Sequence, residues 1–385
     1  MPLRLIFLLA MLLPALAQAQ RSQEAWELLK MRQLDTARAV ADLDVAAAPG
    51  KTSAESWYVR GMIYKSIYDR DDYGEKHQGE HIDLTAFDSY KRAIELDAAH
   101  AYTNGILEDL LALTEDFCRT GLDLFEKGYE NRKPHDLAEA ARYLDAVAEA
   151  FALLGPRQVT VHKSLQEYGI DKNTLEVCRA LAKDQAGQRE DAARILTELV
   201  TAKSSEPAVY LCLKDYYLLQ DRKGKALEVL ERGRKAAPKD LPLALAYAEL
   251  LADTGRAAEA RTLASGLAKA NPQEAAPLAS LGFIEEKRSN PDKAETYYLQ
   301  ALEVEPADFT ANFRLGKLYF KRAEEAKARK ATQLYVRELQ QRCIAYAEVA
   351  AKADPKHPGN SRILLELYNA LGMADKAQQL KLDLN

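Results

Sequence analysis

The residues of this chain that could do chemistry are few and widely spaced. His77 and His81 lie four residues apart in a stretch, residues 69–84, that is rich in Asp and Glu. On a helix this spacing would place both imidazoles on one face, where neighbouring carboxylates could complete a metal site. Gly74 and Gly79 make a regular helix unfavourable here. We therefore interpret the stretch as a solvated polar loop and predict neither a metal site nor a cofactor.

Motifs for nucleophilic or phosphate chemistry are missing from the sequence. There is no nucleophile elbow, phosphate loop, metalloprotease helix or paired-carboxylate motif. The four cysteines are dispersed without the C-x-x-C spacing of metal or haem sites, at Cys118, Cys178, Cys212 and Cys343. We predict that the protein is not an enzyme. A catalytic site assembled from distant parts of the chain is the alternative.

The N-terminus has the pattern of a secretory signal peptide. Arg4 precedes an apolar run over residues 5–16, and small residues follow up to Ala19. We place the signal peptide at residues 1–19, with cleavage after Ala19 or, as the alternative, after Ala17. The apolar run is shorter than the roughly 20 residues of a spanning helix. The sequence predicts an exported protein, periplasmic or secreted, with no transmembrane segment after cleavage.

Charge and composition limit the class of partner and of fold. The chain has 53 Lys and Arg against 58 Asp and Glu, a formal charge of −5. A nucleic-acid-binding protein would be expected to carry a basic surface, so we predict no nucleic-acid partner. Only 18 glycines and 14 prolines occur among the 385 residues. This composition favours helix throughout the chain.

A repeat of 34 residues organises the second half of the chain. Prolines recur at this interval, and an alanine precedes each of them by twelve residues. The pairs are Ala226 and Pro238, Ala260 and Pro272, and Ala294 and Pro306. The unit nearest to a consensus reads Leu278-x-x-Leu281-Gly282, Ala294-x-x-x-Tyr298-x-x-Ala301 and Pro306. Small residues at the eighth and twentieth places allow two antiparallel helices to approach closely, and proline ends the second helix.

This pattern resembles the tetratricopeptide repeat. The resemblance implies an all-α, right-handed superhelical solenoid of about eight to nine helix pairs, in which stacked neighbours bury each other's apolar faces. Near the N-terminus, Trp57-Tyr58-x-Arg60-Gly61-x-x-Tyr64 follows the signal peptide. Over about the first 155 residues the chain is therefore similar to exported tetratricopeptide-repeat proteins of Bacteroidetes. That similarity implies no defined activity.

The repeat register divides the mature chain into two blocks. We predict an N-terminal block over residues 20–155 with a loop insertion at 67–85, a linker at 156–172, and a C-terminal block over 173–385. A helical insertion around residues 320–342 adds about two turns to each arm of one hairpin. It carries seven basic and three acidic residues. We interpret it as a solvated helical face, with contact to acidic lipid or a partner as the alternative.

The register also places two cysteines at equivalent positions of adjacent repeats. Cys178 and Cys212 are 34 residues apart. Equivalent positions on stacked helices are about 8–10 Å apart, whereas a disulfide needs Cα atoms within about 7 Å. We predict four thiols and no disulfide.

In tetratricopeptide folds the second, fifth, ninth, twelfth and thirteenth places of each first helix line a concave groove. The resemblance therefore implies a groove that changes from acidic and apolar to aromatic and basic. Its predicted residues are Leu211, Asp215, Leu218, Glu249, Phe283, Lys287, Phe313, Lys317, Phe320, Lys321 and Arg362. Exposed aromatic rings are costly unless a ligand covers them. The alternative is that these rings pack against the next helix or the insertion.

These patterns predict an exported, non-enzymatic scaffold that binds a protein or peptide partner in the groove. A different class of function is also open. Exposed rings such as those of Phe283, Phe313 and Phe320 could stack on sugars, as in a glycan- or polymer-binding envelope component for nutrient capture or wall assembly.

Overall fold

The computed structural model describes residues 21–48, 50–70, 72, 76–77, 79–131, 133–355 and 357–384. Every regular element in these residues is a helix. The predicted signal peptide and its cleavage sites lie outside the described residues. Within them, no helix has both the length and the apolar character needed to cross a membrane.

The chain forms two compact units, Met1–Leu199 and Val200–Asn385, called unit 1 and unit 2 below. Unit 1 begins with a helix over residues 21–30. Its further helices are α2 (Leu34–Ala46), η1 (Gly50–Thr52), α3 (Ala54–Tyr68), α5 (Ile82–Leu96), α6 (Thr103–Glu130), α7 (Pro134–Leu154), η2 (Gly155–Arg157), α8 (Gln158–Glu167), α9 (Lys172–Gln185) and α10 (Arg189–Thr201), within which the boundary falls.

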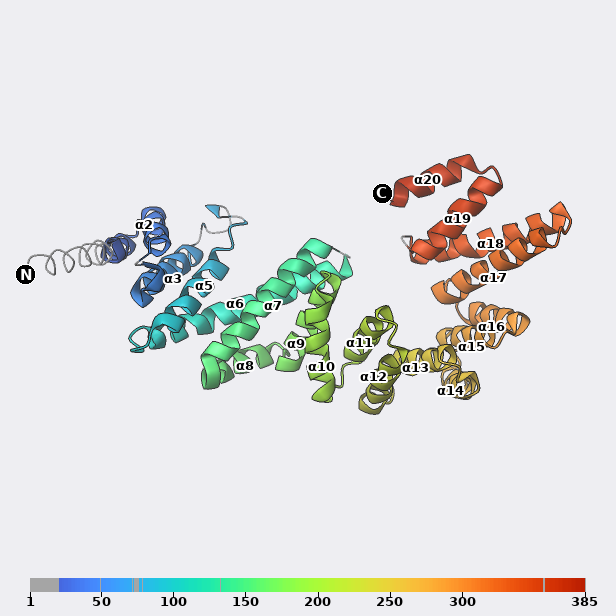
Figure 1. The fold of residues 1–385 in the computed structure, drawn as a ribbon, viewed down its shortest axis with the longest axis horizontal. Coiled ribbons are helices and arrows are strands. Elements are labelled where there is room, and N and C mark those ends of the chain that lie inside the picture. The colour runs from blue at the N-terminus through green and yellow to red at the C-terminus, as the bar shows by residue number, and fades with distance from the viewer. Residues whose placement is uncertain are drawn as a thin grey trace, which may run out of the picture. The chain divides into compact units, whose positions relative to one another are not determined.

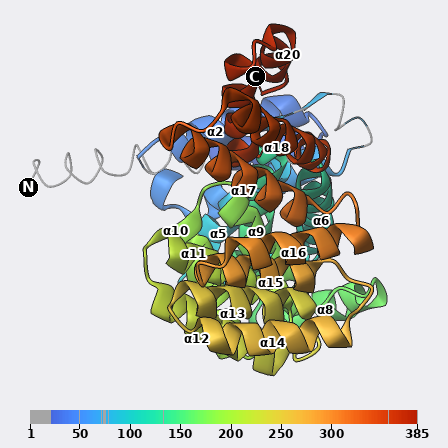
Figure 2. The ribbon, with the colours of Figure 1, turned by 90° about the vertical axis from the view of Figure 1, so that its right-hand side faces the viewer.

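After the end of α10, the described residues of unit 2 form five successive helix pairs. They are α11 (Pro207–Leu219) with α12 (Lys223–Ala236), α13 (Leu241–Asp253) with α14 (Ala257–Ala270), α15 (Ala276–Lys287) with α16 (Pro291–Val304), α17 (Phe309–Ala328) with α18 (Gln333–Ala353), and α19 (Pro358–Ala370) with α20 (Ala374–Leu384). The two helices of a pair pack together, and each pair packs on the next. Within unit 2, α12, α14 and α16 lie on the outer side of the curved stack, and α11, α13 and α15 lie on its inner side (Figure 1; Figure 2). The predicted all-α solenoid of tetratricopeptide type is confirmed.

Glycine at the helix crossing makes room for a tyrosine from the second helix of the pair. A Cβ atom built on Gly282 would lie 2.3 Å from Cε1 of Tyr298, and one on Gly61 would lie 2.4 Å from Cδ1 of Tyr90. Both tyrosine rings are fully buried. Because any side chain at these glycines would overlap the ring, the close approach requires glycine itself.

Several first helices begin at an aspartate that caps the free N–H groups. The side chains of Asp171, Asp240 and Asp308 each accept a hydrogen bond from the backbone N–H three residues later. These N-caps are 69 and 68 residues apart, close to twice the repeat interval, and they satisfy donors that a helix start leaves without a partner. The start of these three first helices is therefore specified locally by sequence.

The boundary between the units differs from the predicted linker at residues 156–172. Part of this segment is helix α8, and its Val161 and Leu165 are buried in the core of unit 1. The division lies instead between Leu199 and Val200. This helix of ten residues buries only two apolar side chains, four residues apart, which is too short a pattern to show a period in sequence.

The loop between α3 and α5 is not the fully solvated segment that we predicted. His77 is buried, and two ion pairs connect the loop to α2. Lys76 Nζ lies 2.5 Å from Asp35 Oδ2, and Arg38 Nη1 lies 2.6 Å from Glu80 Oε2. Residues 71, 73–75 and 78, and with them Gly74, lie outside the described residues. Among those described, no three His, Cys, Asp or Glu side chains form a group that could hold a metal ion.

The cysteines differ in burial. Cys118 and Cys343 are buried, and burial raises the pKa of each thiol to about 12. These two side chains behave as small apolar groups of the core. Cys178 and Cys212 are half-buried and belong to different units. The absence of a disulfide stays a prediction.

Candidate functional site

The first helices of four consecutive pairs in unit 2 carry polar and charged side chains that interact from one helix to the next. We call this set the inner face. It comprises Lys214 and Asp215 of α11, Glu249 and Asp253 of α13, Ser280, Phe283, Glu286 and Lys287 of α15, and Arg314 of α17. The second helices of the pairs contribute none of these residues, so the set follows the side of the stack that the first helices form.

Glu249 occupies the middle of the inner face. Its carboxyl group is affected by charges from both directions along the stack, with Lys214 on one side and Arg314 on the other. Burial is the strongest influence and raises the pKa of Glu249, as does the nearby Asp253, whereas Arg314, the Ser280 hydroxyl and Lys214 lower it. The net effect is a raised pKa. Side chains three pairs apart therefore act on one carboxyl group, as expected where first helices converge on a curved inner surface.

Phe283 lies beneath two cations rather than facing solvent. Its side chain is only 7% exposed. The guanidinium carbon of Arg314 lies 4.1 Å from the ring centroid, and Lys287 Nζ lies 5.0 Å from it. Lys287 Nζ also lies 2.5 Å from Asp253 Oδ1. The prediction that Phe283 offers an exposed ring is wrong, because cation–π contacts with Arg314 of the next pair and with Lys287 of its own helix cover it.

The other two predicted aromatic residues are also engaged within the protein. Phe313 is stacked on Phe309 with ring centroids 5.7 Å apart, and its centroid lies 4.6 Å from that of His357. Both Phe313 and Phe320 are half-buried and pack against the core of unit 2. His357 is the N-cap of α19, so the following pair supplies the cover. The alternative interpretation, in which the ring packs against the next helix, describes Phe313 correctly.

The remaining predicted groove residues divide by exposure. Leu211 and Leu218 are half-buried. The exposed ones are all charged, namely Asp215, Lys287, Lys317, Lys321 and Arg362. The exposed part of the predicted groove is therefore charged, with Leu219 of α11 as an exposed apolar neighbour, and it lacks the aromatic stripe that we expected.

Sequence reasoning missed several inner-face residues, of which Lys214 and Asp253 had a usable signal. Lys214 occupies the eighth place of its repeat, where the next three repeats have Ala248, Gly282 and Gly316. Asp253 occupies the thirteenth place, which is itself a groove position. Arg314, at the sixth place, had no such signal, because only the folded chain brings it over Phe283.

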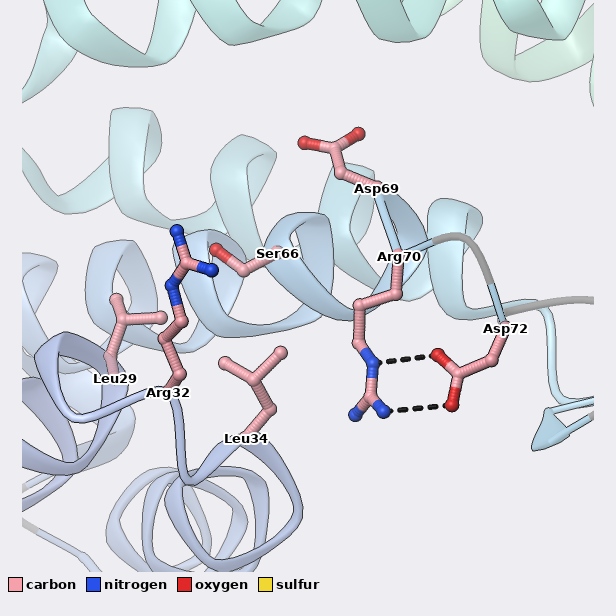
Figure 3. A pocket seen from close by; sticks show the side chains of 7 residues that line it. All are labelled: Leu29, Arg32, Leu34, Ser66, Asp69, Arg70 and Asp72. Atoms are coloured by element: carbon pink, nitrogen blue, oxygen red, sulfur yellow. Dashed lines mark hydrogen bonds and ion pairs between the residues drawn. The ribbon is translucent and has the colours of Figure 1, made fainter.

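A cavity in unit 1 is the other concave feature of interest (Figure 3). It has a volume of about 720 Å³ and is lined by Leu29, Arg32, Leu34, Ser66, Asp69, Arg70 and Asp72. Arg70 forms two hydrogen bonds of 2.8 Å with Asp72, and Asp69 accepts from Lys65 at 2.6 Å. Most charges in the described lining are neutralised locally, so these residues do not form the converging unpaired groups of a reaction centre.

The raised pKa of Glu249 leads to a prediction for stability. The folded protein holds this proton more tightly than the unfolded chain, whose value is near the ordinary 4.5. The free energy of unfolding of the wild type should therefore fall as pH rises from the unfolded to the folded pKa. A Glu249→Gln variant lacks this loss, so its stability relative to the wild type should increase across that window.

Urea unfolding of both proteins, followed by circular dichroism over a pH series, measures the difference. Lys214, Asp253 and Arg314 are present in both proteins, and their own titration therefore largely cancels. If the stability difference between Glu249→Gln and the wild type stays constant with pH, the fold does not disfavour the ionised form of Glu249.

No protein-family model matches the chain, and no curated protein sequence matches it. Among solved structures, the chain is similar to yeast Tom70, at 11% identity and a TM-score of 0.45 over 94% of this chain and 90% of that one. It is also similar to a human IFIT1 dimer with PPP-AAAA, at 16% identity and a TM-score of 0.44, over 84% of this chain and 71% of that one. A third similar structure is a tetratricopeptide repeat protein from Parabacteroides merdae, at 14% identity and a TM-score of 0.42, over 69% of this chain and 91% of that one.

Proposed function

We propose that this protein is an exported, non-catalytic scaffold that binds a protein or peptide across the inner face of unit 2. One observation carries the proposal: charges of both signs are linked across the first helices of four consecutive pairs, and several of them are exposed. Asp215 is 63% exposed and Lys287 is 41% exposed at the side chain. Helix axes in such stacks are about 8–10 Å apart, so four first helices span roughly 30 Å. That length corresponds to about nine residues of an extended peptide.

The order of the charges suggests the kind of peptide that would fit. Asp215 and Glu249 lie toward the N-terminal end of unit 2, whereas Lys317, Lys321 and Arg362 follow on α17 and α19. A partner segment with basic residues at one end and acidic residues at the other would complement both ends. The formal charge of −5 also favours a protein over a nucleic acid as the partner.

Glycan binding receives less support from the side-chain arrangement. Stacking on sugars would depend on the rings of Phe283, Phe313 and Phe320. The first is covered by Arg314 and Lys287, and the other two pack against the core of unit 2. The exposed residues of the predicted groove are charged, and they suit a peptide better than a neutral polymer.

Site-specific cross-linking tests the proposal. A photoreactive amino acid at Asp215 or Lys317, both exposed, should form an adduct with the same envelope protein from extracts of the producing cells. The matched control places the same photoreactive group at Lys269 of α14 or Lys293 of α16, which are exposed on the second helices. These positions should not form the adduct. Charge reversal by Lys287→Glu should weaken the captured complex about tenfold through the lost charge complementarity. The proposal would be contradicted by equal adducts at all four positions, or by the absence of adducts at Asp215 and Lys317.

A further inference from the structure

The hairpin of α17 and α18 is longer than the other pairs of unit 2. Its helices have 20 and 21 residues, whereas the neighbouring pair α15 and α16 has 12 and 14. Figure 1 shows the shared end of α17 and α18 protruding from the stack. We call residues 326–337 the hairpin tip. The extra turns move the tip away from the inner face, so it forms a separate surface.

The hairpin tip is strongly basic although the whole chain is acidic. It contains four basic residues and no acidic one. Lys327 lies 2.6 Å from Glu324, and Arg329 lies 3.9 Å from Glu325. Lys330 and Arg337 are exposed and form no ion pair within the part of the chain that the structure describes. Two cations at the end of the hairpin are therefore available to an external anion.

Large apolar side chains are exposed directly beside these cations. Leu334 is 80% exposed and Tyr335 is 50% exposed. The core of the hairpin is formed instead by Val336 and Leu339, which are buried. Leu334 therefore adds little to the fold, and its position at the start of α18 costs free energy in water unless something covers it.

A cavity opens next to the hairpin tip. It has a volume of about 550 Å³. Lys327 and Arg337 contribute positive charge to its lining. Ala370, the last residue of α19, and Leu371, the C-cap of that helix, contribute apolar groups. An anionic head group would meet positive charge there, and the carbon atoms attached to it would meet apolar side chains.

We propose that the hairpin tip binds the surface of an anionic phospholipid membrane. Leu334 and Tyr335 enter the head-group layer, where an apolar side chain and a tyrosine ring are both stabilised. Lys330 and Arg337 contact the lipid phosphates while their methylene groups lie along the apolar boundary. This inference does not depend on the inner face binding a partner.

Vesicle co-sedimentation of the full chain tests this inference. We expect the protein to sediment with vesicles of phosphatidylcholine mixed with phosphatidylglycerol, not with phosphatidylcholine alone, and to dissociate as salt concentration rises. Each basic residue near an anionic surface strengthens binding about fivefold. The Lys330→Gln, Arg337→Gln double variant should therefore lower the partition coefficient roughly 30-fold. Leu334→Ala should lower it several-fold with no change of charge.

The matched control is the Lys239→Gln, Lys269→Gln double variant. It removes the same charge from two exposed lysines of unit 2 outside the hairpin and should bind the vesicles like the wild type. Circular dichroism confirms that all variants stay folded. The inference is overturned if anionic vesicles do not bind, if both double variants lose binding equally, or if an acidic protein binds the tip while vesicles do not.

Discussion

Replacing Tyr298 with alanine is expected to lower the free energy of unfolding of unit 2 by about 3–5 kcal/mol, the usual cost of truncating a large buried ring. The Tyr298 side chain is fully buried and fills the space above Gly282. Its hydroxyl donates a hydrogen bond of 2.5 Å to Glu286 on the inner face. The variant therefore loses both packing within the α15–α16 pair and a link to the candidate binding surface. Chemical denaturation followed by circular dichroism measures the change.

A double-variant cycle isolates the contact between the ring and the glycine. Gly282→Ala alone should cost about 1–3 kcal/mol, the usual range for overpacking, because its Cβ would lie 2.3 Å from the Tyr298 ring. Adding Gly282→Ala to Tyr298→Ala should cost little, since the obstructing ring is gone. Gly266→Ala in α14 is the control. No atom lies within 4 Å of a Cβ built there, so this change should be neutral or slightly stabilising. Gly282→Ala behaving like Gly266→Ala would contradict the proposed packing.

Replacing Arg60 with lysine should destabilise unit 1 by about 2–3 kcal/mol, the range for hydrogen bonds to a charged group. The Arg60 guanidinium connects three helices. It donates to Asp42 of α2 at 2.7 Å and to the Ser89 hydroxyl of α5 at 2.6 Å, and it lies 4.5 Å from the Tyr64 ring centroid. A lysine ammonium can replace one of these contacts but not the planar, forked arrangement.

Arg92→Lys provides the comparison for this substitution within α5. Arg92 forms an exposed ion pair with Glu95, and exposed pairs contribute little to stability. Its replacement should change the free energy of unfolding by less than about 0.5 kcal/mol. Urea titration of both variants is sufficient, and equal effects would show that Arg60 does not connect the helices as described.

Local features of the sequence were enough to predict the repeat architecture. The 34-residue interval, the small residues at helix crossings and the prolines all act within one helix pair, and the structure has Ala226, Ala260 and Ala294 fully buried at those crossings. These contacts join residues close in sequence, so their pattern repeats along the chain and can be recognised without a structure.

Burial and pairing across repeats were decided only by the tertiary structure. The repeat register gives the angular position of Phe313 on its helix, but His357, 44 residues later, determines that the ring is covered. In the same way Arg314 covers Phe283 from the next pair. A side chain from another repeat can cover a residue or leave it exposed, and in either case the 34-residue sequence period is unchanged. The sequence alone therefore predicted which surface the first helices form, whereas the folded chain determined that this surface is charged and not aromatic.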